Sequence, residues 1–385
     1  MNRKRRKKQV SARTSLFLIE LYGGILFLLL ICLLLAFFAL LLGVYFMLFE
    51  LLDYILTQPW QWGWRVVLLG SCLMVTSVLV VRLAWRMALA ILGLVTRKYD
   101  ESTLTETTHA LSDTDSPGLY ELVREVSHTI GALPPDEVRV SPAVECYVIE
   151  ERRFAIRTRR HLTLVIGLPH LLVLELAELK VILVHEMAHS GGGDTTITVF
   201  LFRFVESLRI AVDELAARGR WWYACDPFYW FFVGFHRLVH RAAVSLQWHR
   251  ELRADAISAE TFGGTLATHT LLKEWLLENQ FDEVVEQYMA KGPNDTHKNV
   301  FAFFVDRWRE FGRTSEAYLE QRLNQQEESS FLDSHPSMKT RIKLMRDFPD
   351  PAPTGSRAAN QLLTNLDAIQ HGLHDQLFDS LRSSC

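Results

Sequence analysis

The chain has 385 residues, enough for a membrane anchor with one sizeable globular domain or for two smaller domains. Its formal net charge of -3 lacks the general basic character of nucleic-acid binders, so we expect no nucleic-acid partner. The five cysteines form no CxxC pair or regular framework, which argues against a zinc ribbon or a disulfide scaffold and suits a reducing compartment.

The N-terminal region predicts a membrane anchor. A basic block from Arg3 to Lys8 precedes an apolar run over residues 16–49, in which Glu20 is the only ionic side chain. A second apolar run covers residues 66–95, and about 20 apolar residues suffice for a helix to cross a bilayer. A cleaved signal peptide is the alternative, but its apolar core should be only about 7–15 residues long. We therefore expect two transmembrane helices over these runs.

The charges around the two runs predict their orientation. Arg97 and Lys98 follow the second run, whereas the loop between the runs carries Glu50, Asp53 and three tryptophans. Positive charge stays on the cytoplasmic side of a membrane, and tryptophan favours the membrane interface. Residues 1–98 are therefore expected to form a hairpin that has the bilayer as a partner and leaves the rest of the chain on the cytoplasmic side.

A polar segment and a sheet pattern follow the anchor. Residues 99–116 are rich in Thr, Ser, Asp and Glu and are expected to form a solvated linker. Apolar residues at helical spacing predict an amphipathic helix over 117–130. Partly alternating apolar and polar residues then predict three short strands, at 138–140, 147–156 and 161–166. Because the later pattern is helical, we expect a predominantly helical α+β fold.

An HExxH motif carries the chemistry that the sequence suggests. His185, Glu186 and His189 lie at the end of an apolar segment with a helical pattern. Two histidines four residues apart share one helical face and can both bind zinc, and the neighbouring glutamate can act as general base toward water. Zinc lowers the pKa of water to about 7 and polarises a scissile carbonyl. The alternative is a helix with two surface histidines.

A catalytic zinc needs a third protein ligand, and Glu251 is the best candidate. Glu251 and Asp255 lie four residues apart and share a helical face, so one can bind the metal while the other orients a ligand histidine. The alternative is a pair of solvated acids between arginines. His236 and His240 form a rival pair, but their apolar neighbours favour a helix at a membrane interface or against the core.

These motifs resemble those of the membrane-associated gluzincin metallopeptidases, a family that includes the CAAX prenyl endopeptidase and the HtpX-type heat-shock membrane protease. The resemblance implies a zincin-like metallopeptidase domain with a small β-sheet over residues 117–348, and it leaves 349–385 as a C-terminal tail. It rests on these matches: Gly167-Leu168, Glu178-Leu179, His185 to His189, Gly193-Asp194, Arg250-Glu251, Ala254-Asp255, His335-Pro336-Ser337 and Arg341.

The resemblance implies a role for each residue of the metal site. Glu186 would be the catalytic base. One zinc ion per chain would be held by three side chains, those of His185, His189 and Glu251. These ligands would be supported by two carboxylates, Asp255 and Asp194.

The resemblance also implies substrate contacts. His335 and Arg341 match a late motif whose side chains hold the substrate or the developing oxyanion, although a helix start with a surface arginine is the alternative. Family members usually carry an Asn-Ala pair on a substrate-binding strand, whereas this chain has Glu145, Cys146 and Tyr147 there. Backbone groups of these three residues can still receive the substrate as an added strand.

The leading hypothesis is a membrane-anchored zinc endopeptidase that hydrolyses polypeptides, such as misfolded membrane proteins. Two other classes stay open, a catalytically inactive membrane scaffold and a zinc hydrolase of a non-peptide amide. HtpX-type proteins have further spanning helices between the motifs, whereas residues 195–212 and 221–235 are expected to form interfacial or buried helices. Cleavage of prenylated peptides would need several spanning helices and is not expected.

Overall fold

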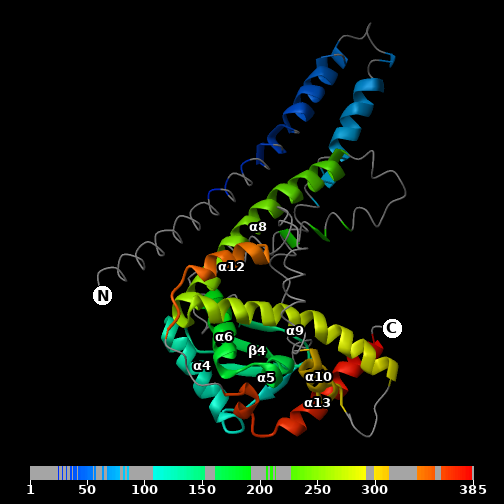
Figure 1. Ribbon diagram of the computed structural model, residues 1–385. Helices are drawn as coiled ribbons and strands as arrows, with labels where there is room; N and C mark the ends of the chain where they lie inside the picture. The colour runs from blue at the N-terminus through cyan, green and yellow to red at the C-terminus, as the bar shows by residue number, and fades with distance from the viewer. Residues whose placement is uncertain are drawn as a thin grey trace. The chain divides into compact units, whose positions relative to one another are not determined.

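The computed structural model of the chain divides into two compact units (Figure 1). One comprises Met1–Lys98 and Thr195–Leu246, and the other comprises Tyr99–Asp194 and Gln247–Cys385. The structure describes residues 107–151, 161–191, 227–291, 299–311, 336–351 and 357–383, together with parts of 25–85 and of 205–213.

The first unit contains the segments expected to span the membrane. Its described residues between 25 and 85 are almost all helical, and many large apolar side chains there are exposed. Among the described residues, no helix combines the length and the apolarity that crossing a membrane requires. Much of 16–49 and 66–95 lies outside the described residues, as does most of 195–212. The membrane hairpin therefore stays a prediction.

The described residues of the second unit form a mixed four-stranded sheet in the order β1-β2-β4-β3. Its strands are β1 (His109–Leu111), β2 (Glu137–Ser141), β3 (Cys146–Glu151) and β4 (His161–Gly167). β2 runs parallel to β4, while β1 and β3 lie antiparallel to their neighbours, so β3 forms one edge of the sheet. The three expected strands are confirmed, although residues 152–156 of the second lie outside the described part.

Helix α4 (Pro117–Ile130) has the bounds that the apolar spacing predicts. Proline fits the first turn of a helix, and Gly131 ends α4 in the left-handed conformation at φ 70°. The hydroxyl of Tyr120 donates to the carbonyl of Leu111 at 2.8 Å, and Leu111 is buried in the core. The segment 99–116, expected to be a solvated linker, therefore differs from that expectation, because it contains β1 and part of the core.

Helices α5 (Leu168–Val173) and α6 (Leu176–Gly191) follow β4 directly. The side chain of Glu178 accepts a hydrogen bond from the backbone N–H of Glu175 at 2.8 Å, which satisfies one of the free donors at the start of α6. The apolar residues of α6 are buried in the same core as α4 and the sheet, and they include Leu179, Leu183, Val184 and Met187. Each such leucine contributes about 1.5–3 kcal/mol on burial, which holds the motif helix in place.

Helices α8 (Pro227–Phe262) and α9 (Gly264–Lys291) meet at a tight turn. Gly263 has a φ of 99°, a conformation that residues with a side chain rarely adopt. A Cβ atom on Gly264 would clash with the carbonyl oxygens of Met345 and Phe348. The two glycines therefore let the later chain approach the turn closely.

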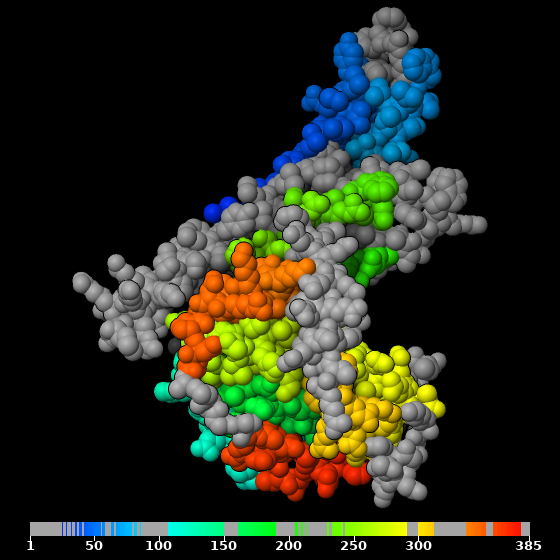
Figure 2. Space-filling view, in the orientation of Figure 1, coloured from blue at the N-terminus to red at the C-terminus, as the bar shows by residue number. Residues whose placement is uncertain are grey.

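Helix α12 (Met338–Arg346) packs against α9 in the second unit. Three residues of α12, Met338, Ile342 and Met345, share a core cluster with Ala267 and Leu271 of α9. In the space-filling view, α12 appears in orange directly over the yellow-green start of α9 (Figure 2). The side chain of Asp350 accepts hydrogen bonds from the backbone N–H and the hydroxyl of Thr265, which joins the chain after α12 to the start of α9.

The remaining described elements complete the core. They are α10 (Val300–Phe311), the 3-10 helix η3 (Ala359–Leu362) and α13 (Leu366–Ser383). Phe301 and Phe304 of α10 are fully buried, and Leu373 of α13 lies in the same cluster. Residues 349–385, set apart as a C-terminal tail from the sequence, thus include a helix that belongs to the core of the second unit.

Candidate metal centre

The two histidines of the motif converge on one point. One helical turn separates His185 and His189 on α6, and their Nε2 atoms lie 3.3 Å apart. Both side chains are partly exposed, although the helix around them is buried. The helical spacing therefore presents both ring nitrogens on one face, as the sequence predicts.

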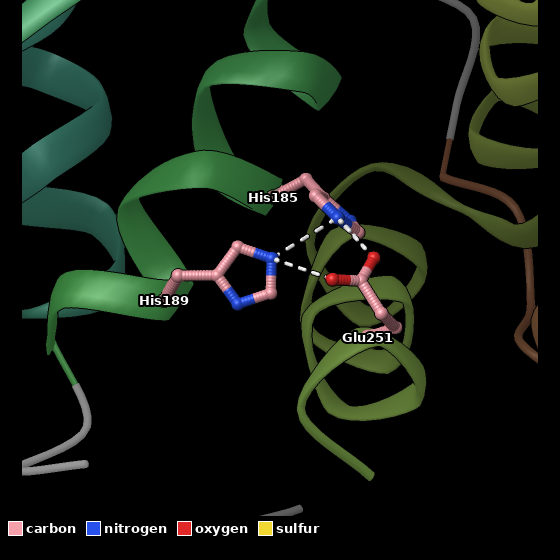
Figure 3. Close-up of side chains that lie close together, drawn as sticks. All are labelled: His185, His189 and Glu251. Atoms are coloured by element: carbon pink, nitrogen blue, oxygen red, sulfur yellow. Dashed lines mark hydrogen bonds and ion pairs between the residues drawn. The ribbon is translucent and has the colours of Figure 1, made fainter. Parts of the chain in front are cut away.

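Glu251 meets these histidines from another helix. It is a buried residue of α8, and Figure 3 shows its carboxylate pointing at both imidazole rings. Its Oε2 atom lies 3.4 Å from Nε2 of His185, and its Oε1 atom lies 3.6 Å from Nε2 of His189. Residues more than sixty positions apart in the sequence thus form one compact group.

The distances within this group suit zinc. Ligand atoms about 2.0–2.1 Å from a tetrahedral zinc ion lie roughly 3.3–3.4 Å from one another. The three observed separations of 3.3, 3.4 and 3.6 Å come close to that value. Two imidazoles and one carboxylate also form a common ligand set of catalytic zinc. Among the described residues, His185, His189 and Glu251 form the one group of three that could hold a metal ion.

Asp255 supports the first ligand. Its Oδ1 atom lies 3.2 Å from Nδ1 of His185, which fixes the hydrogen on Nδ1 and leaves Nε2 directed at Glu251. Asp255 in turn accepts two hydrogen bonds of 2.7 Å from Arg341 on α12. Arg341 also lies 3.9 Å from Oε2 of Glu251. The arginine therefore acts on the ligands, through a carboxylate that is almost fully buried.

Gln247 supports the third ligand. It lies one turn before Glu251 on α8, and its side-chain N–H donates to Oε1 of Glu251 at 2.7 Å. This hydrogen bond restricts the rotation of the carboxylate that faces the two histidines. Sequence reasoning missed Gln247, and its only signal was the spacing of four residues before the third ligand.

The ionisable side chains of the site shift one another's pKa values. Burial acts to lower the pKa of His185, but contacts with Asp255 and Glu251 raise that pKa to about 10. Burial and the charge of His185 lower the pKa of His189 to about 3. Burial raises the pKa of Glu186 to about 8, against the opposing effect of His185. A cation bound here would compete with the proton on His185, so metal binding should weaken in acid.

Of the other predicted site residues, two lie outside the described residues and three lie at or next to the start of β3. Asp194 and His335 lie outside the described residues. Glu145 precedes β3, where its carboxylate accepts a hydrogen bond from Ser141, while Cys146 and Tyr147 begin the strand. β3 packs against α6, and burial, then the charges of Glu186 and Glu274, raise the pKa of the Cys146 thiol.

The rival histidine pair belongs to no group of three metal-ligand side chains among the described residues. The rings of His236 and His240 lie 5.7 Å apart on α8. Within the part of the chain that the structure describes, they do not join a third ligand at metal-binding distance. The geometry therefore favours Glu251 as the partner of the motif histidines.

A small mixed sheet, beside a helix that presents two histidines to a glutamate from a later helix, is the arrangement of a zincin-like metallopeptidase domain. The comparison with protein-family models matches Peptidase family M48 over residues 152–348, just over half of the 385 residues. The chain therefore belongs to peptidase family M48, a family of zinc metallopeptidases, which confirms the resemblance of the motifs. Searches of curated proteins and of solved structures found no match.

Proposed function

We propose that the protein is a zinc-dependent endopeptidase that hydrolyses peptide bonds within polypeptides. The observation that carries this proposal is the convergence of His185, His189 and Glu251 at separations that suit one zinc ion. Membership of a metallopeptidase family supports the same reaction.

The residues of the site have distinct tasks in this reaction. A zinc ion held by the three ligands would polarise the scissile carbonyl and lower the pKa of a water molecule to about 7. Glu186 takes the proton of the attacking water and passes it to the leaving amine. Burial acts to raise the pKa of Glu186, which strengthens its carboxylate as a proton acceptor. Arg341 and Asp255 hold His185 in the required tautomer.

The substrate binds along strand β3 in this proposal. β3 pairs on one side with β4 and forms an edge of the described sheet, and an edge strand can receive an extended peptide through backbone hydrogen bonds. Cys146 begins β3 close enough to Glu186 for the carboxylate to affect its thiol. A peptide paired beside Glu145, Cys146 and Tyr147 would therefore pass the proposed base. His335 is kept as a further substrate contact on the match to the late motif alone.

We place this activity at the cytoplasmic face of a membrane. The support comes from the apolar runs 16–49 and 66–95, from the basic residues at both ends of the hairpin, and from exposed apolar side chains in 25–85. Misfolded or damaged membrane proteins are the proposed substrates because the anchor would hold the site near them. The bilayer is the other proposed partner, and no nucleic acid is involved.

The test of this function is Glu186→Gln, assayed with an unfolded casein-like substrate in detergent. We expect a loss of at least about 100-fold in cleavage while the zinc content stays at one per chain, because the substitution removes the base but no metal ligand. Glu260→Gln, on the exposed side of α8, is the matched control and should cleave normally.

Three results would contradict the proposal. Undiminished cleavage by Glu186→Gln would refute the mechanism. Wild-type protein without stoichiometric zinc and indifferent to chelators would point to a scaffold. Hydrolysis of small amides but never of polypeptides would point to a different substrate class.

A further inference from the structure

Glu274 on α9 is a partly exposed carboxylate that pairs with an imidazole and with no lysine or arginine among the described residues. Its side chain is 34% exposed, and its one ion pair within the described residues is with His170, whose Nε2 atom lies 3.7 Å from Oε1. No lysine or arginine of the described chain lies within ion-pair distance of it. The nearest positive group to the carboxylate is therefore an imidazole, while the charges of His185 and Arg341 act on it from beyond ion-pair distance.

Glu178 on α6, by contrast, is a carboxylate whose negative charge is paired with a lysine. Its side chain is buried, and Nζ of Lys273 lies 2.6 Å from it, with His269 at 3.3 Å. The backbone N–H of Glu175 donates to it as well. Lys273 is the residue immediately before Glu274 on α9, yet it serves Glu178. The lysine next to Glu274 in the sequence therefore forms its ion pair with Glu178 and not with Glu274.

The imidazole of His170 is held in a position that faces Glu274. It is 1% exposed, and neither of its ring nitrogens has a hydrogen-bond partner among the described residues. Gly167 lies so close that an added Cβ would come within 3.0 Å of Nδ1, so the ring has little room to turn. Burial acts to raise the pKa of Glu274, but the contact with His170 and the charges of His185 and Arg341 outweigh it and lower that pKa, so the carboxylate is charged at neutral pH. The buried imidazole of His170 thus holds the partly exposed carboxylate of Glu274 in place.

This group lies beside the proposed reaction centre. Gly167, which lies against the ring of His170, donates its backbone N–H to the carbonyl of Glu145 at 2.6 Å, so the His170–Glu274 pair lies close to the start of the edge strand β3. α9 also packs against α5 and α6, the helices that carry His170 and the motif. A peptide bound along β3 would therefore pass a partly exposed carboxylate that no lysine or arginine of the described residues pairs with.

We propose that Glu274, oriented by His170, receives a cationic group of the substrate and so selects peptides that carry a positive charge near the scissile bond. This inference rests on the proposed function, because it assigns the substrate class of the same site. The cation is either a lysine or arginine side chain or a free N-terminal amine, since both present an ammonium or guanidinium group to a carboxylate.

The test separates binding from cleavage. In the Glu186→Gln background, which cannot turn over substrate, fluorescence anisotropy would compare peptides that differ only by lysine or acetyl-lysine at successive positions. We expect at least 10-fold tighter binding of one lysine peptide, and Glu274→Gln should abolish this preference. Comparing free with acetylated N-termini distinguishes an amine from a side chain. The active enzyme should show the same preference in kcat/KM.

Two further variants keep the outcome decisive. Glu278→Gln, one turn further along α9 and exposed, should retain the preference. Glu274→Asp keeps the charge and should restore part of the preference if Glu274→Gln loses it, which a merely structural role would not do. The proposal is overturned if wild-type and Glu274→Gln proteins bind charged and neutral peptides alike, or if Glu274→Gln keeps the preference. Failure of cleavage with charge-selective binding intact would instead refute only the proposed function.

Discussion

Arg341 donates two parallel hydrogen bonds to Asp255, from Nε to Oδ2 and from Nη2 to Oδ1, each 2.7 Å long. The same Oδ1 atom lies 3.2 Å from Nδ1 of His185. The pair therefore connects α12 to the histidine ligand on α6 through α8. The motif match assigns Arg341 to substrate binding, whereas in the structure its guanidinium group orients the proposed metal ligands through Asp255.

This relationship predicts a loss of zinc affinity without loss of any ligand. We expect Arg341→Met to weaken zinc binding by about 10–100-fold, the usual effect of losing a group that orients a metal ligand. Asp255→Asn should act similarly, and the double variant should lose little more because both act through one contact. Competition with a chelator measures the affinity. Arg346→Met, on the exposed end of α12, should bind zinc normally, and strictly additive losses would contradict the connection.

The assignment of the third ligand predicts a graded response along α8. Glu251→Ala should purify with much less than one zinc per chain, because only two histidines remain. Gln247→Leu should keep zinc but release it faster to a chelator, because the hydrogen bond to Oε1 of Glu251 is lost. Metal analysis by atomic emission and a chelator-capture time course measure these quantities. Full zinc in Glu251→Ala would show that another residue is the third ligand.

The buried carboxylate of Glu178 predicts an acid-sensitive contribution to stability. Burial acts to raise its pKa, but His269, Lys273 and the N–H of Glu175 lower it below the ordinary value of 4.5. A depressed pKa in the folded state means that the stabilisation is present above about 4.5 and is lost as the pH falls through the folded pKa. Glu178→Gln should therefore cost about 1–3 kcal/mol at pH 7 and progressively less in acid.

The control for Glu178 is a carboxylate of the same surface region that is solvated. Glu125 pairs with Lys180 at 2.7 Å but is well exposed, so Glu125→Gln should cost only about 0–1 kcal/mol at any pH. Urea unfolding of both variants at pH 7 and near pH 3.5 makes the comparison. An equal cost at both pH values for Glu178→Gln would contradict the burial argument.

Leu373 of α13 predicts how far the fold depends on its last described helix. Because the side chain is fully buried in the core cluster of the second unit, Leu373→Ala should cost about 2–5 kcal/mol of stability. Asp375→Ala on the exposed side of the same helix should change stability little. Thermal unfolding followed by circular dichroism tests both. A negligible effect of Leu373→Ala would mean that α13 is dispensable.

Local patterns predicted the parts of the structure that depend on local contacts. The helix over 117–130 followed from apolar spacing within one short segment. The shared face of His185 and His189 followed from helical geometry alone. Glu251 was predictable because its spacing from Asp255 and its neighbours match a family motif, although nothing local shows that it reaches the histidines.

Contacts between distant segments escaped prediction. β1 is three residues long and gains its structure by pairing with β2, so its own sequence reads as part of a polar linker. The pairing of Glu274 with His170 joins α9 to α5 across about a hundred positions. Hydrophobic periodicity assigns faces to single helices, but it does not say which polar residue of one face meets which residue of another.

The placement of Leu373 in the core also bears on the order of events during synthesis. The three proposed zinc ligands lie between residues 185 and 251, so they emerge well before α13 does. The core that supports them is nevertheless incomplete until Ile369 and Leu373 are available to fill it. A nascent chain would thus carry the whole ligand set before the core that supports it is complete.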